Sequence, residues 1–151
     1  MKNYQQLADQ ILDLCWEFAQ TDPAKAVTKA KEMAVAKDLN NKRGAQYTPS
    51  GNCNQPGVDL FSPGRPPVQS KTCQGSSYRS GGCVTIQKIV DKAIKVDPDA
   101  ELSFARLEGS KVVEHVIGPA KLLDGYTTSE GNPAYSINFE MLDLMGFKNV
   151  E

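Results

Sequence analysis

Three residues in the C-terminal half of the chain have side chains that together could carry out nucleophilic catalysis: Cys83, His115 and Asp124. Cys83 directly precedes an apolar pattern of helical spacing, so we expect it at the N-terminus of a helix. The unpaired N–H groups and the positive dipole end of a helix at that point favour a thiolate over a thiol. His115 would accept and return a proton, and Asp124 would orient the imidazole ring. The pattern predicts attack of a thiolate on a carbonyl carbon.

The residues just before Cys83 are candidates for binding a substrate. Gly82 leaves steric room for a carbonyl group to approach, and the backbone N–H groups beside it could form an oxyanion hole. Tyr78 lies five residues upstream of the cysteine and is a candidate for substrate contact.

Each of these residues also has an ordinary structural interpretation. Free cysteine is among the most buried residue types, so Cys83 is also a candidate for the core. A lone histidine on a strand is commonly a hydrogen-bonded structural residue, and Asp124 before Gly125 is typical of a turn. Only the order of the three residues along the chain favours catalysis.

The elements that would position these residues are predicted from the spacing of apolar side chains. Residues 3–20 and 23–38 each show one apolar stripe of helical period, with Thr21-Asp22-Pro23 as a stop and restart between them. We expect the two helices to pack against each other as a hairpin, because the second stripe is rich in alanine. The first stripe contains Leu7, Ile11, Leu14, Cys15 and Phe18, and the second contains Ala26, Val27, Ala30, Met33 and Ala34.

Residues 39–82 are rich in Pro, Gly, Ser and Asn and show almost no periodic apolar pattern. We expect a long irregular segment, because loops of this length in a domain are usually either functional or disordered. The segment is either a surface excursion or the lining of a cleft. Cys53 and Cys73 could form a disulfide across part of it in an oxidising environment.

The remainder of the chain predicts a helix on a small antiparallel sheet. We expect a helix from Cys83 to Ile94, strands over 101–107 and 111–117, a short strand over 120–123 and a last strand over 135–139. A closing helical turn is predicted at 141–145. The fold class is therefore α+β, and residues 1–151 form a single domain. Its parts are the helical hairpin (1–38), the irregular segment (39–82) and the helix with its sheet (83–151).

The order of these elements resembles the core of the papain-like and transglutaminase-like cysteine enzymes. The resemblance covers residues 80–126, where Gly82-Cys83 opens a helix, Glu114-His115-Val116 lies on a hairpin strand and Leu122-Leu123-Asp124-Gly125 follows. It implies a cysteine hydrolase or acyl transferase that acts on a peptide, isopeptide or glutamine amide bond. It also implies that an upstream glutamine, Gln74 or Gln69, completes the oxyanion hole.

Composition limits the other classes of function. The chain has 17 basic and 18 acidic residues, and this balance gives no electrostatic footprint for nucleic acid or for anionic lipid. No segment is long and apolar enough for a membrane span, and the N-terminus lacks the pattern of a secretory signal, so we expect a cytoplasmic protein with reduced thiols. Four cysteines and one histidine show no zinc-ligand spacing, so we expect no metal and no other cofactor.

Two alternatives to an enzyme remain open at this point. One is a non-enzymatic binding or inhibitor protein, such as a small viral or bacterial accessory protein, that uses residues 39–82 as its binding surface. The other is a structural subunit whose irregular segment becomes ordered only in an assembly. In each case we expect a protein or peptide partner.

Overall fold

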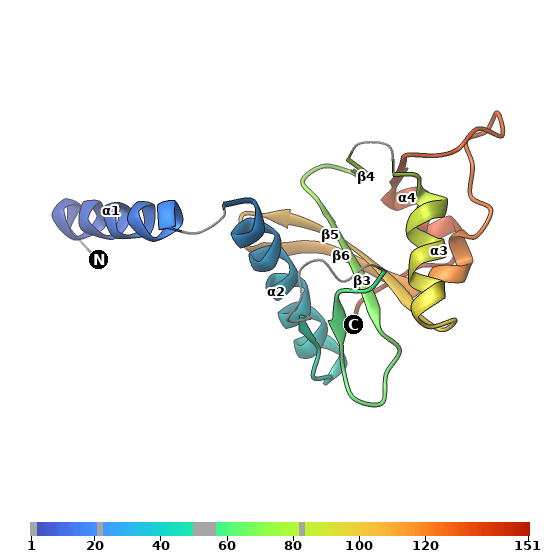
Figure 1. Cartoon of the computed structure of the whole chain (residues 1–151), viewed down its shortest axis with the longest axis horizontal. Coiled ribbons are helices and arrows are strands. Elements are labelled where there is room, and N and C mark those ends of the chain that lie inside the picture. The colour runs from blue at the N-terminus through green and yellow to red at the C-terminus, as the bar shows by residue number, and fades with distance from the viewer. Residues whose placement is uncertain (1–2, 21–22, 50–56, 82–83) are drawn as a thin grey trace.

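The computed structural model describes residues 3–20, 23–49, 57–81 and 84–151, and it confirms a mixed α+β fold with helices at the N-terminus and a helix on the sheet (Figure 1). The helices are α1 (Tyr4–Gln20), α2 (Pro23–Arg43), α3 (Ile86–Val96), the 3-10 helix η1 (Ala120–Leu123) and α4 (Phe139–Leu144). The strands are β1 (Thr48–Pro49), β2 (Leu60–Phe61), β3 (Val68–Cys73), β4 (Ser77–Arg79), β5 (Glu101–Glu108), β6 (Lys111–Pro119), β7 (Ser136–Asn138) and β8 (Lys148–Asn149).

The main sheet has the strand order β1-β2-β3-β5-β6-β8, and β4 pairs with β7 in a separate two-stranded sheet. All ladders of the main sheet are antiparallel except the one between β3 and β5. The expectation of a purely antiparallel sheet is therefore wrong at this pair. A parallel pair needs a crossover connection, and α3 lies in the connection between these two strands.

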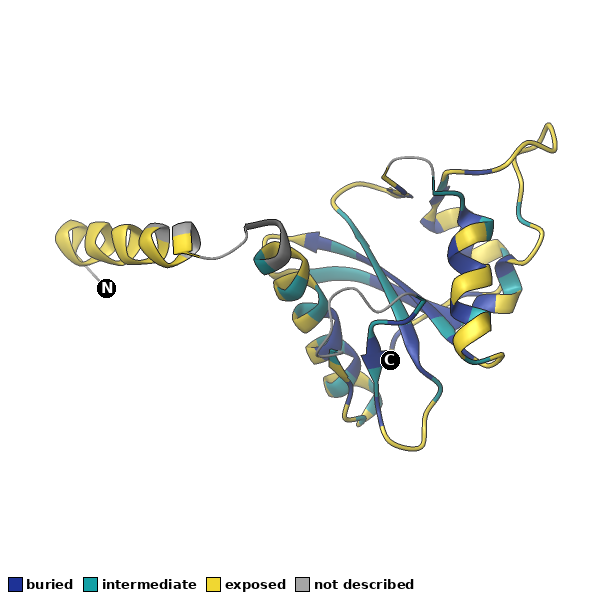
Figure 2. Cartoon of the chain, in the orientation of Figure 1, coloured by how far each residue is buried: buried dark blue, intermediate teal, exposed yellow. Residues whose placement is uncertain are grey.

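The two faces of the main sheet are covered by different helices. On one face α2 packs through Val35 and Leu39 against Ala105 of β5, and on the other α3 and α4 pack around Phe104. Successive side chains of a strand point to opposite faces, so Phe104 and Ala105 mark the two layers. Figure 2 shows buried residues along the strands and on the helix faces turned toward them.

The segment over 39–82 is more regular than the sequence predicts. It continues α2 to Arg43 and contains β1 to β4, including the six-residue strand β3 between β2 and β5. The expected irregular segment is therefore wrong over these strands. A search for alternating apolar and polar residues does not detect strand β3 (VQSKTC), because most of its side chains are polar.

The N-terminal helices are confirmed, but their expected packing as a hairpin is wrong. Helix α1 extends away from the rest of the molecule (Figure 1), and Leu7, Ile11 and Leu14 of its stripe are 43%, 60% and 64% exposed. The side chains of Cys15 and Phe18 lie outside the described residues. An apolar stripe predicts that a helix needs a partner, but it does not specify where that partner lies.

In the C-terminal half, the predicted helix and hairpin are confirmed as α3, β5 and β6. The short strand expected over 120–123 is instead the 3-10 helix η1. The strand expected over 135–139 is β7, which ends at Asn138; the side-chain oxygen of Asn138 accepts a hydrogen bond from the Met141 N–H and caps α4. In the part of the chain that the structure describes, no helix has the length and apolar character needed to cross a membrane.

Candidate functional site

The predicted catalytic series is not assembled by the described residues. Cys83 and Gly82 lie outside the described residues. His115 on β6 is 3% exposed, its Nδ1 lies 2.7 Å from Asp38 Oδ2, and its Nε2 is hydrogen-bonded to Ser103 Oγ. Asp124 is exposed, and its Oδ1 accepts a hydrogen bond of 2.7 Å from Gln87 Nε2. The expected contact between His115 and Asp124 is therefore wrong.

The layers of the fold explain why this contact does not form. His115 pairs with Ala105 across the β5–β6 ladder, so its side chain lies on the face of the sheet that α2 covers. Helix η1 carries the chain back to the opposite layer, where it packs against α3, and Asp124 follows it there. A strand over 120–123 would have kept Asp124 beside β6.

Burial lowers the pKa of His115, and the hydrogen bond and charge of Asp38 only partly oppose this effect. A neutral ring that donates from Nδ1 to Asp38 accepts at Nε2 from the Ser103 hydroxyl group, so both nitrogens are satisfied. His115 thus ties α2 to β5 and β6 as a structural residue of the core.

The other predicted substrate-binding residues have separate locations. Tyr78 on β4 is buried in an edge-to-face contact with Phe104, with 5.5 Å between ring centroids, and burial raises its pKa to about 12. Gln74 is exposed after β3. Gln69, in contrast, lines a pocket, together with residues that the sequence analysis did not select.

This pocket lies at the edge of β3 and has a volume of about 190 Å³. Helix α2, the residue before β2 and strand β3 all contribute to it. Its lining residues are Thr28, Lys31, Glu32, Asp59, Gln69, Ser70, Lys71 and Thr72. We call it the β3-edge pocket.

The backbone of β2 and β3 fixes the position of Asp59. Strand β2 pairs with β3 through Leu60 and Val68, and the Asp59 N–H donates to the Val68 carbonyl oxygen at 2.9 Å. One step further along, the Ser70 N–H donates to Asp59 Oδ2 at 3.1 Å. The Asp59 side chain thus takes the place of a neighbouring strand at the edge of β3.

A glycine two residues before Asp59 lies directly against helix α3. Gly57 has φ +95°, and a Cβ there would lie 2.5 Å from the Lys92 carbonyl oxygen and 2.9 Å from Val96 Cγ2. Only glycine combines this backbone conformation with such close contact to α3.

The charges in the β3-edge pocket are held in partly dry surroundings. Burial, together with the charge of Glu32, raises the pKa of Asp59 to about 6. Burial lowers the pKa of Lys71, and the Asp59 charge opposes this effect. Glu32 Oε2 lies 3.2 Å from Lys29 Nζ. Opposite shifts on neighbouring acid and base groups in one pocket are typical of functional sites.

Two further oxygen atoms at this pocket lack hydrogen bonds within the described structure. Gln69 Oε1 and Ser70 Oγ are buried and have no partner among the described residues. A buried polar atom without a partner costs about 1–3 kcal/mol, so such atoms call for a ligand, an ion or water.

The oxygen donors of the β3-edge pocket suit a hard divalent cation. Carboxylate oxygens of Glu32 and Asp59 and the amide oxygen of Gln69 are the donor types that Mg²⁺ prefers. No cluster of three or more His, Cys, Asp or Glu side chains with metal-site geometry occurs in the described ranges. The protein would therefore fill only part of the coordination sphere, and Mg²⁺ commonly completes it with water and substrate phosphate.

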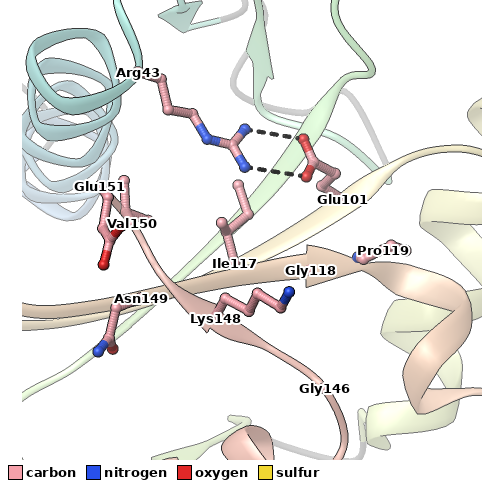
Figure 3. Close-up of a pocket in the computed structure, with 10 residues that line it drawn as sticks. All are labelled: Arg43, Glu101, Ile117, Gly118, Pro119, Gly146, Lys148, Asn149, Val150 and Glu151. Carbon is pink, nitrogen blue, oxygen red and sulfur yellow. Dashed lines mark hydrogen bonds and ion pairs between the residues drawn. The ribbon is translucent and has the colours of Figure 1, made fainter.

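A larger cavity of about 380 Å³ lies on the other side of α2, beside β6 and β8 (Figure 3). Arg43 and Glu101 point toward each other across it and form two hydrogen bonds of 3.1 Å and 3.3 Å. Because these two charges already neutralise each other, the cavity offers less for ligand chemistry than the β3-edge pocket.

The sequence analysis selected Gln69 for another role and missed Glu32, Asp59 and Lys71. The available signal was local: an acid before a short apolar pair, then Gln69 and Lys71 two residues apart, which places them on one side of an extended strand. Comparison with protein-family models and with curated proteins found no match for this chain.

Proposed function

We propose that this protein is a divalent-metal-dependent phosphodiesterase whose active site is the β3-edge pocket. The observation that carries the proposal is the combination in one pocket of two carboxylates, a buried amide oxygen without a partner and a desolvated lysine. Glu32 already pairs with Lys29 at 3.2 Å, but Asp59, the amide oxygen and the lysine are each costly to bury alone, and a cation with a bound phosphate would compensate them.

The metal ion would be bound by the carboxylates of Asp59 and Glu32, which lie close enough for the Glu32 charge to raise the pKa of Asp59. Water and an oxygen of the phosphate group would complete its coordination. A divalent ion bound there would lower the pKa of a water ligand and would polarise the phosphoryl oxygen.

Lys71 would bind the non-bridging oxygens of the phosphate beside the metal. In the hydrolytic step the water oxygen would form a bond to phosphorus and release a proton to the solvent, the bond from phosphorus to the leaving oxygen would break, and the leaving oxygen would take up a proton from the solvent. A positive charge that is already in place stabilises the extra negative charge of the transition state without reorganisation. This role requires the charge of Lys71 more than its exact shape.

Nucleic acid is the substrate class that the surroundings of the pocket favour. Helix α2, which supplies Glu32, Thr28 and Lys31, carries six basic and two acidic residues. Lys42 and Arg43 form ion pairs with Asp38 and Glu101 away from the pocket, so the positive charge that would attract a polyanion there comes from Lys31 and Lys71 of its lining. This proposal departs from the sequence-based expectation of a protein or peptide partner without nucleic acid, in which nucleic acid was excluded by the balance of 17 basic and 18 acidic residues.

The direct test is cleavage of a circular plasmid and of single-stranded DNA and RNA oligonucleotides in the presence of about 5 mM Mg²⁺ or Mn²⁺. We expect cleavage that EDTA abolishes. Asp59→Asn and Lys71→Ala should each lose at least about 100-fold, because each removes a charge that acts on the transition state. Lys71→Arg should retain part of the activity.

Asp143→Asn is the matched control, because it makes the same change at an exposed carboxylate on α4. Cleavage that survives in Asp59→Asn, or that is absent from the wild type with all these substrates and metals, would contradict the proposal.

The thiol-hydrolase hypothesis stays a prediction for Cys83, and no contact of the described residues favours it. Its proposed base, His115, uses both ring nitrogens within the core. Alkylation of Cys83 that slows in a His115→Ala variant would revive it.

A further inference from the structure

The outward side of α3 carries a stripe of three lysines. Lys88, Lys92 and Lys95 are spaced i, i+4 and i+7, so they share one side of the helix, and all three are exposed (Figure 2). The opposite side of α3 packs on the core through residues such as Ile89 and Ala93. In the part of the chain that the structure describes, no carboxylate forms an ion pair with any of the three lysines. The stripe therefore presents unpaired positive charge to the solvent.

The lysine stripe lies on the same side of the sheet as Lys71 of the β3-edge pocket. Lys71 is in register with Phe104, around which α3 packs. A Cβ at Gly57 would lie 2.5 Å from the Lys92 carbonyl oxygen, so this turn of α3 lies directly beside the segment that leads to Asp59. Burial lowers the pKa of Lys71, the Asp59 charge opposes this effect, and the charge of Lys92 lowers the pKa further. Lys71 and Lys92 thus connect the pocket to the stripe.

The single acidic residue of α3 is turned away from this connection. Asp91 Oδ1 accepts a hydrogen bond of 2.8 Å from Gln87 Nε2, and the same nitrogen donates to Asp124 Oδ1 at 2.7 Å. Asp124 follows η1, so Gln87 and Asp91 mark the side of α3 that faces η1. The contact of α3 with Gly57 is made on a different side, at Lys92. The side of α3 that borders the pocket is therefore basic.

We infer that a nucleic-acid strand leaves the β3-edge pocket over Lys71 and follows the lysine stripe of α3. The choice of nucleic acid as the occupant rests on the proposed function, because a polymer of phosphodiesters presents further phosphates beyond the one in the pocket. From Lys88 to Lys95 the helix rises about 10 Å, at about 1.5 Å per residue, which about three nucleotides cover at about 3.4 Å of rise each. Lysine binds phosphate as a point charge on a flexible stem, so we expect binding without sequence specificity.

The test measures the affinity of the full chain for a fluorescein-labelled single-stranded DNA of about 12 nucleotides, by fluorescence anisotropy in EDTA. The main variant replaces Lys88, Lys92 and Lys95 with alanine, the strongest helix former, so α3 should be retained. We expect it to bind at least about tenfold more weakly, and the slope of log Kd against log salt to fall by about 0.7 for each lysine removed. Lys111→Ala, the same change at an exposed lysine of the β5–β6 hairpin, should bind like the wild type.

The use of EDTA separates this inference from the proposed function, since binding is measured without metal-dependent cleavage. A wild type that binds through the lysine stripe but cleaves nothing when metal is added would refute the phosphodiesterase and support the binding surface. Equal affinities of the wild type and the triple variant for DNA would overturn the inference, whether or not the protein cleaves DNA. A wild type that does not bind DNA would also overturn it, as would binding to vesicles of anionic lipid in place of DNA.

Discussion

At the scale of single residues, Asp59 and Lys71 show that the β3-edge pocket is built at a cost in stability. Burial raises the pKa of Asp59 and lowers the pKa of Lys71, so both groups favour their neutral forms more than they would in water. Their mutual attraction opposes these shifts without cancelling them. The raised pKa of Asp59 predicts that neutralising this residue stabilises the fold at neutral and alkaline pH.

We therefore expect Asp59→Asn to be more stable than the wild type in EDTA at pH 8. The carboxyl of Asp59 has a pKa of about 6 in the folded protein instead of 3.8. Its ionisation therefore lowers the free energy of unfolding of the wild type as pH rises through that window, by about 2–3 kcal/mol in all. The asparagine does not ionise, so it avoids this loss. Urea unfolding should show that the variant has a higher free energy of unfolding than the wild type at pH 8, and that the two proteins are equally stable near pH 4. Equal free energies of unfolding for the variant and the wild type at pH 8 would contradict the claim that burial raises the pKa of Asp59.

His115 predicts the opposite pH dependence. Its pKa is lowered in the folded state, so below pH 6.5 the unfolded chain takes up a proton that the folded chain resists. Stability from this group is present above pH 6.5 and is lost as pH falls below that value. In the wild type the titration of Asp59 opposes this loss. The Asp59→Asn variant lacks that titration, so we expect its free energy of unfolding to fall between pH 7 and pH 5.

The variant that isolates this effect is His115→Gln in the Asp59→Asn background. The chain has a single histidine, so no other imidazole contributes. The glutamine should lower stability at pH 7, because Asp38 and Ser103 lose their partner, and it should remove the dependence between pH 7 and pH 5. An unchanged slope would show that His115 is not the titrating group.

At the scale of elements, the parts of the fold that bury apolar side chains were predictable and the parts that form the pocket were not. Helix α3 and the β5–β6 hairpin follow from the spacing of residues such as Ile89, Val90 and Leu102, which lie in the core. Strand β3 carries Gln69, Ser70 and Lys71 where apolar residues would be expected. A test for alternating apolar residues cannot find a strand whose side chains are mostly polar.

The predicted catalytic series failed for a related reason. The hypothesis requires His115 to lie on the face of the sheet that α3 covers. His115 is in register with Ala105 and lies on the face that α2 covers, whereas η1 and Asp124 lie in the layer of α3. Which helix covers which face of a sheet is a tertiary feature that the order of elements along the chain does not specify.

The connection into β2 gives a prediction about Gly57. Gly57→Ala should destabilise the fold by more than about 2 kcal/mol, because the added Cβ would meet the Lys92 carbonyl oxygen and the backbone has positive φ. Gly64→Ala is the matched control: it also has positive φ, at +75°, but no atom lies within 4 Å of its added Cβ. We expect the control to cost only about 1–2 kcal/mol in thermal or urea unfolding. Equal losses would show that the contact with α3 is unimportant.

At the scale of the whole molecule, a net charge of −1 conceals two segments of opposite sign. Acidic α1 extends from the body and basic α2 lies across the sheet beside the β3-edge pocket (Figure 1). The positive charge beside the pocket would attract a polyanion, whereas total composition averages local charge over the whole chain.

The most direct measurement is the affinity of the wild type and of Asp59→Asn for Mn²⁺, monitored by electron paramagnetic resonance at pH 7.5. Mn²⁺ takes the same oxygen ligands as Mg²⁺ and reports binding without any substrate. We expect one site per chain in the wild type, an affinity at least about tenfold weaker in Asp59→Asn, and wild-type binding in the Asp143→Asn control. Equal binding by all three proteins, or no binding by the wild type, would contradict a metal site at the edge of β3.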